Sequence, residues 1–124
     1  MTMKPRLSII SILFFCLLIS ACGPKRLGPE LTKDGVSFTF YAPEARSVAI
    51  AGTFNAWDTH KNRLSGPDNN GVWHIIIPLP EGRYEYLFIV DGKKWQPDPF
   101  VPEVDDGFGG KNSVLLIGKE NPGL

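Results

Sequence analysis

The chain of 124 residues has little of what catalysis or cross-linking usually needs. It holds two cysteines and two histidines, His60 in a polar stretch and His74 in an alternating apolar pattern without an acidic or nucleophilic neighbour. No Gly-x-Ser-x-Gly nucleophile elbow, phosphate-binding loop or His/Cys metal spacing occurs. These absences argue against an enzyme, and we expect neither a cofactor nor a metal.

An excess of charge of either sign is also missing. Thirteen Lys and Arg balance thirteen Asp and Glu. A domain that binds nucleic acid carries a basic patch or stripe, and anionic lipid attracts polybasic segments. Nucleic acid is therefore not an expected partner.

The N-terminal apolar run is too short to span a bilayer. Residues 7–19 are thirteen in number, whereas a spanning helix takes about 20. Lys4 and Arg6 precede the run, and Ile19-Ser20-Ala21-Cys22 closes it, an order typical of a secretory signal. The ending resembles a bacterial lipobox, which implies cleavage before Cys22 and diacylation of its sulfur. The alternatives are an ordinary signal peptide with an incidental cysteine, or an uncleaved anchor.

Lipobox processing would leave one small domain attached to membrane at the cell envelope. Cys16 would be removed with the signal peptide 1–21, so no thiol or disulfide would remain. Gly23 stands where an aspartate would resemble an inner-membrane retention signal of enteric bacteria, so we expect the outer membrane if the host is Gram-negative. Residues 22–34 are expected to form a lipid-anchored tether, 35–118 the folded domain and 119–124 a C-terminal tail.

Beyond the tether, apolar residues alternate with period two, and turn-forming Gly, Pro, Asn and Asp interrupt them. This pattern predicts an all-β antiparallel sandwich of about seven strands, with strands near residues 36–41, 47–51, 72–77, 84–90, 93–96 and 112–117. We expect Trp73 in the core, together with Tyr84, Tyr86 and Phe88. Residues 97–110 are expected to form an ordered loop that Phe100, Val101 and Phe108 anchor.

Seven motifs in register resemble one family. They are Val36-Ser-Phe-Thr-Phe-Tyr-Ala-Pro43, Val48-Ala-Ile-Ala-Gly-Thr-Phe-Asn-Ala-Trp-Asp58, Gly71-Val-Trp73, Leu79-Pro-Glu-Gly-Arg-Tyr-Glu-Tyr86, Phe88-Ile-Val-Asp-Gly92, Asp98-Pro99 and Asn112-Ser-Val114. The series resembles the glycogen-recognition domain of the AMP-activated protein kinase beta subunit and the early-set domain of isoamylases and glycogen branching enzymes. These form carbohydrate-binding module family 48. The resemblance implies an immunoglobulin-like (early-set) sandwich that binds α-1,4-glucans.

The resemblance also implies which residues contact the sugar. The two family tryptophans match Trp57 and Trp95, although two lysines precede Trp95 where the family has one residue, and the family asparagine matches Asn112. The family leucine falls on Phe108. The family lysine falls on Leu87 and the family threonine on Gly110, so both polar groups are lost. Lys93 or Lys94 could reach the region of the missing lysine.

The chemistry of these side chains suits a sugar, but each has a structural alternative. An indole is a flat, rigid surface for a sugar ring, and an asparagine both donates to and accepts from hydroxyls. Trp57 and Trp95 would be exposed platforms or would pack under the 97–110 loop, and Asn112 would bind sugar or brace a strand start. We expect Asp98-Pro99 to form a turn, and we favour a solvated loop over a calcium site at Asp105 and Asp106.

Three functions follow from these observations. The first is a non-catalytic, lipid-anchored module for glycogen, starch or maltodextrin. The alternative is a protein-interaction or structural module that has lost sugar binding and has an envelope protein as its partner. The third is a glucan-active enzyme, which would need two carboxylates across a cleft that a lone sandwich of this size does not offer.

Overall fold

Alternating side chains divide the long strands of the computed structural model into a core face and an outer face. The structure describes residues 27–118, and the predicted signal peptide, the Cys22 lipidation site and the C-terminal tail lie outside them. Within that range the fold is all-β and antiparallel, apart from one 3₁₀ turn, η1 (Thr53–Asn55). The fold class expected from the sequence is confirmed.

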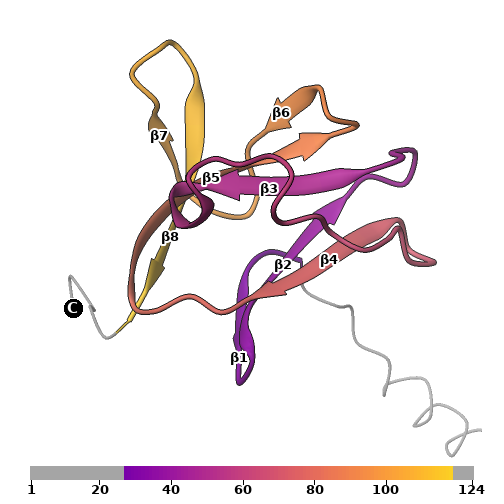
Figure 1. Ribbon diagram of the computed structural model, residues 1–124, viewed down its shortest axis with the longest axis horizontal. Helices are drawn as coiled ribbons and strands as arrows, with labels where there is room; N and C mark the ends of the chain where they lie inside the picture. The colour runs from indigo at the N-terminus through magenta and orange to yellow at the C-terminus, as the bar shows by residue number, and fades with distance from the viewer. Residues whose placement is uncertain (1–26, 119–124) are drawn as a thin grey trace, which may run out of the picture.

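Two sheets face each other across the core (Figure 1). The first sheet has the order β1-β2-β4, formed by β1 (Glu30–Thr32), β2 (Gly35–Tyr41) and β4 (Val72–Ile77). The second has the order β3-β5-β8-β7, formed by β3 (Val48–Gly52), β5 (Gly82–Val90), β8 (Lys111–Ile117) and β7 (Glu103–Asp105). β6 (Lys94–Gln96) also pairs with β5, along the half that β8 leaves free.

Aromatic side chains from both sheets fill the core. Phe38 of β2 meets Tyr86 of β5 edge to face, with ring centroids 5.1 Å apart, and Phe40 lies 4.5 Å from Phe88. Such contacts add about 0.5–1.5 kcal/mol each beyond the burial of area. Trp73 is buried as expected, and its indole donates to the Ala42 carbonyl oxygen at 2.9 Å.

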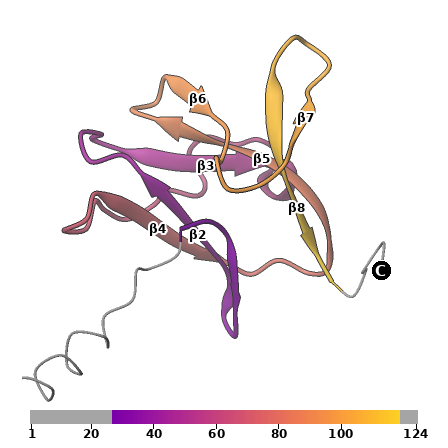
Figure 2. The same cartoon turned by 180° about the vertical axis from the view of Figure 1, so that it is seen from behind.

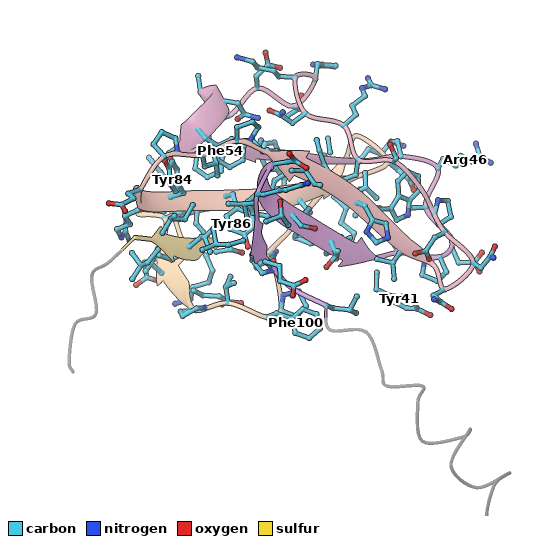
Figure 3. The ribbon with its side chains drawn as sticks, turned by 90° about the horizontal axis from the view of Figure 1, so that it is seen from below. Tyr41, Arg46, Phe54, Tyr84, Tyr86 and Phe100 are labelled. Carbon is cyan, nitrogen blue, oxygen red and sulfur yellow. The ribbon has the colours of Figure 1, made fainter. Side chains whose placement is uncertain are left out.

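Tyr86 and Phe88 are also buried as predicted, whereas Tyr84 is only half-buried. It packs beside Phe54 at the edge of the core, with ring centroids 6.3 Å apart (Figure 3). Tyr84 lies nearer the end of β5, where the opposing sheet no longer covers it fully.

Part of the predicted tether belongs to the folded domain. Glu30–Thr32 forms β1, which pairs with the start of β2 through a turn in which the Thr32 hydroxyl donates to the Gly35 carbonyl oxygen at 2.8 Å. Upstream of β1, the Gly28 amide donates to the Thr39 hydroxyl at 2.9 Å. The folded domain therefore begins before residue 35, by residue 28.

The 97–110 segment is more regular, and less well anchored, than predicted. It contains β7, which pairs with β8 in the hairpin that projects from one end of the molecule (Figure 2). Val101 packs on the core, but Phe100 and Phe108 are exposed, so the expectation that both anchor the segment is wrong. No helix within residues 27–118 has the length and hydropathy to cross a bilayer.

Candidate functional site

The outer face of the second sheet carries two of the residues proposed for sugar contact, Trp95 and Asn112. Because Tyr86 and Phe88 point into the core, the alternating residues Glu85, Leu87 and Ile89 point to the outer face of β5. Ala51 lies opposite Leu87, and Ala49 lies opposite Ile89. Ala49, Ala51 and Ile89 are buried there, and Leu87 is partly exposed.

Trp95 rises from the same face. It lies directly opposite Ile89 in the pairing of β5 with β6, and residues directly opposite each other share a face. Its side chain is 46 % exposed. The additional lysine before Trp95 is accommodated in the turn between the strands, where Asp91 and Gly92 adopt positive φ angles of 54° and 70°. The insertion therefore leaves the indole on the outer face.

Trp57 is held by a turn that the buried Asn55 organises. The Asn55 side-chain oxygen accepts from the Gly52 amide at 2.9 Å, and its nitrogen donates to the Ile50 carbonyl at 3.1 Å and to the Asn62 side chain at 2.8 Å. Trp57 follows with a left-handed φ of 58°, and its amide donates to the Gly52 carbonyl at 2.9 Å. Its side chain is half-buried.

Gly52 stands at the close approach between this turn and β5. A Cβ at this position would clash with the Glu85 carbonyl oxygen and would lie 2.8 Å from the Phe54 ring. Gly52 pairs with Tyr86, and Trp95 pairs with Ile89, three residues further along β5. The anchor points of the two tryptophans are therefore about 10 Å apart along the strand.

Asn112 lies on the outer face, but its side-chain amide is hydrogen-bonded to another side chain. Its amide nitrogen donates to the Glu85 carboxylate at 3.1 Å, and the residue is only 8 % exposed. The hydrogen bond from Asn112, and then that from Arg83 at 2.7 Å, hold the pKa of Glu85 below its usual value. Little of the Asn112 amide is left for a ligand, and the partly exposed Glu85 carboxylate stands beside it.

Phe108 occupies the tip of the β7–β8 hairpin. The Asp106 carboxylate accepts from the amides of Phe108 and Gly110 at 2.6 and 3.0 Å, and Gly107 and Gly109 take positive φ angles on either side. This tight turn leaves Phe108 93 % exposed. A phenyl ring held outward in this way can contact a ligand but contributes nothing to the core.

The two lysines differ in position. Lys94 lies on β6 opposite Val90, so it points away from the face that carries Trp95, and the structure does not bring it beside Leu87. Lys93 lies in the turn, where its amide donates to the Val90 carbonyl at 3.1 Å. Gly110 sits under the Asp106 carboxylate and offers no hydroxyl, as the sequence requires.

The sequence reasoning missed Asn55 and Glu85. The signal for Asn55 was its place in Phe54-Asn-Ala-Trp57, where an amide can both accept and donate inside a turn. The signal for Glu85 was its alternation with Tyr84 and Tyr86, which places its carboxylate on the face opposite the core.

The acidic residues considered for metal binding have structural partners. Asp105 pairs with Lys111 at 2.7 Å, and Asp106 organises the hairpin tip. Among residues 27–118 no three His, Cys, Asp or Glu side chains converge as metal ligands. Asp98 is completely buried, and its carboxylate accepts from the Phe100 amide, as expected of a turn-forming residue.

Comparison with known proteins identifies the family of the chain. Residues 26–101 match the family model of carbohydrate-binding module 48, the isoamylase N-terminal domain. Over 73 residues the chain is 38 % identical to Protein PTST homolog 2, chloroplastic, of Arabidopsis thaliana, which covers 59 % of this chain and 13 % of that protein. It is also 39 % identical over 80 residues to a 1,4-alpha-glucan branching enzyme of Pseudomonas fluorescens, and 43 % identical over 58 residues to one of Rhizobium johnstonii.

These two matches cover 60 % and 45 % of this chain but only 10 % and 8 % of the enzymes. The chain thus resembles a short part of each of these longer relatives. The family model covers more than half of the chain and includes both Trp57 and Trp95. The chain belongs to the carbohydrate-binding module 48 family.

Proposed function

We propose that this protein is a non-catalytic, lipid-anchored carbohydrate-binding module for α-1,4-glucans. The observation that carries the proposal is the placement of Trp95, half exposed and opposite Ile89 on the outer face of the second sheet. An indole in this position offers a flat apolar surface to a sugar ring. The 1,4-alpha-glucan branching enzymes among the relatives support an α-1,4-glucan as the ligand.

The tryptophans would share the ligand. Trp57 is fixed by the Asn55 turn, which meets β5 opposite Tyr86, three residues along that strand from the partner of Trp95. Leu87, between them on the outer face, adds apolar contact where the family has a lysine. Binding by stacking with few polar contacts is expected to be weak and little affected by salt.

The absence of catalysis is part of the proposal. The 1,4-alpha-glucan branching enzymes align with this chain over only about a tenth of their length. On the outer face Glu85 is engaged by Asn112 and Arg83, so no pair of free carboxylates faces a ligand there.

The test is electrophoresis of the protein, purified from membranes in detergent, through native gels with and without glycogen. The wild type should be retarded, and Trp95→Ala or Trp57→Ala should weaken apparent binding about tenfold or more. Tyr41→Ala is the matched control, because Tyr41 is an exposed aromatic residue on β2 of the other sheet. Wild-type mobility unchanged by glycogen, amylose or maltodextrin would exclude the proposal.

A protein-interaction role is the second candidate, and Phe108 favours it. A ring 93 % exposed at a hairpin tip suits a protein surface as well as a sugar, and the Asn112 side chain is already hydrogen-bonded to Glu85. Cross-linking in membranes separates the two roles. An adduct with one stoichiometric envelope protein, lost in Phe108→Ser and unaffected by maltodextrin, would favour the interaction module.

The lipid anchor is proposed from the lipobox alone, with the outer membrane as the location in a Gram-negative host. Metabolic labelling with a radioactive fatty acid should label the wild type but not Cys22→Ser. Sucrose-gradient separation of the two membranes then gives the location. An unlabelled wild-type protein released in soluble form would overturn the anchor without affecting the sugar-binding proposal.

A further inference from the structure

A cavity of about 300 Å³ opens at one end of the outer face. Its lining includes Arg46, Ser47, Ala49, His60, Arg63 and Ile89. Arg63 pairs with Ala49, Ala49 with Ile89, and Ile89 with Trp95, so these four residues form one row across the sheet. The cavity is therefore continuous with the face that presents Trp95.

Two arginines, Arg46 and Arg63, bring guanidinium groups to the cavity. Within residues 27–118 neither Arg46 nor Arg63 forms an ion pair. The Asp91 carboxylate accepts from the amides of Arg46 and Ser47 at 2.7 and 3.1 Å, so its negative charge lies beside the Arg46 backbone and leaves Arg63 as the cavity's less compensated guanidinium. Figure 3 shows Arg46 extending at the end of the sandwich remote from Phe54 and Tyr84.

The remaining groups of the cavity are also suited to an anion. Thr59 and Ser47 bring hydroxyl groups, which donate as well as accept, and His60 brings an imidazole. A guanidinium recognises phosphate and carboxylate through two parallel hydrogen bonds, which an uncharged hydroxyl cannot match. A neutral glucan would use neither arginine charge.

We propose that this cavity binds an oxyanion carried by the sugar ligand, as a phosphate ester or a uronate carboxylate. The neutral part of the ligand would extend along the row toward Trp95, so this inference rests on the proposed function for that part. The ligand class becomes an α-1,4-glucan with an anionic substituent. The paired tryptophans supply stacking, and Arg46 and Arg63 supply the discrimination between charged and neutral glucans.

Isothermal titration of the detergent-purified protein tests the proposal with three probes: maltohexaose, maltohexaose carrying one 6-phosphate, and maltohexaose with one 6-hydroxymethyl group oxidised to a carboxylate. At least one anionic probe should bind about fivefold or more tightly than the neutral one, and raising salt should reduce that advantage. The response to the two anionic probes distinguishes phosphate from uronate. Equal affinity for all three probes would overturn the proposal.

Variants of the two arginines test whether the preference for anionic probes arises at the cavity. Arg63→Gln and Arg46→Gln should remove the anionic advantage while leaving maltohexaose affinity unchanged, and Lys33→Gln, a charge removed at the distant β1–β2 turn, should retain it. An advantage that persists in both arginine variants would refute the site. Arginine-dependent binding of the anionic probes without any maltohexaose binding would uphold the site and reject the neutral glucan platform.

Discussion

The phenol of Tyr86 donates a 2.7 Å hydrogen bond to the carboxylate of Asp98, and both side chains are fully buried. The same carboxylate accepts from the Phe100 amide at 2.9 Å, and the Asp98 amide donates to the Ser113 hydroxyl at 2.7 Å. Burial raises the pKa of Asp98 and that of Tyr86. This network attaches the segment after β6 to β5 and β8.

Removing the phenol should therefore destabilise the fold. Tyr86→Phe leaves one carboxylate oxygen of Asp98 buried without a donor, which should lower the free energy of unfolding by about 1–3 kcal/mol. Urea unfolding followed by tryptophan fluorescence measures the change. Tyr84→Phe is the control, because the Tyr84 hydroxyl donates to the Pro80 carbonyl near the surface, and its loss should cost less. Equal midpoints for Tyr86→Phe and wild type would contradict this role of the network.

The Asn55 turn should control the environment of Trp57. Asn55→Ala removes three hydrogen bonds and leaves the Gly52 amide and the Ile50 carbonyl without that partner, so we expect a loss of about 2–3 kcal/mol. Asn62→Ala removes only one of the three and should cost less. Fluorescence emission should shift to longer wavelength in Asn55→Ala as Trp57 becomes more exposed, and unchanged emission and stability would show that the turn forms without Asn55.

Acid should weaken the contribution of Asp68 to stability. Hydrogen bonds from His74 first, and then from the amides of Val72 and Asn70, lower the pKa of Asp68 to about 2 from 3.8. A folded pKa below the unfolded one means that the stabilisation is complete above about pH 4 and is lost as the pH falls toward 2. The melting temperature of Asp68→Asn should lie below that of wild type at pH 6, and the gap should close near pH 2. A gap that stays constant with pH would disprove this coupling.

The hairpin tip should affect binding without affecting folding. Because Phe108 is almost fully exposed, Phe108→Ser should change the free energy of unfolding by less than about 0.5 kcal/mol. If the ring contacts the glucan, retardation in glycogen gels should decrease several-fold. Phe100→Ser is the control, because it removes another exposed ring, between β6 and β7, and so measures the effect of losing apolar surface in general. Identical retardation of Phe108→Ser and wild type would remove Phe108 from the sugar site.

Side-chain alternation predicted those parts of the fold in which an apolar face is long enough to show a period. β2, β4, β5 and β8 were found in this way, and the buried Trp73 followed from its phase with Ile77. β1 was missed because its three residues are exposed and depend on pairing with β2. β7 was missed because Glu103-Val-Asp105 carries two charges and has no apolar face of its own.

The sequence nominated residue types for the candidate site, and those site residues stay a prediction, but it did not reveal their contacts. The turn motifs identified Trp57 and Trp95. The face on which Trp95 lies, however, depends on how the turn after Val90 accommodates the additional lysine. The burial of Asn112 depends on Glu85, 27 residues earlier in the chain, which reaches it only once β5 and β8 pair. A contact between strands that are far apart in the sequence leaves no recognisable pattern in either local segment.

The central position of β5 limits how the chain can change by insertion or deletion. Successive side chains of β5 alternate between the core and the outer face, and β3, β6 and β8 all pair with this strand. One residue inserted after Tyr86 would exchange Leu87 and Phe88 between the outer face and the core, and would change the register with β3 and β6 relative to that with β8. Insertions and deletions are therefore tolerated in turns such as that between Val90 and Lys94 rather than within β5. The outer face of β5 can change only by substitution of its residues.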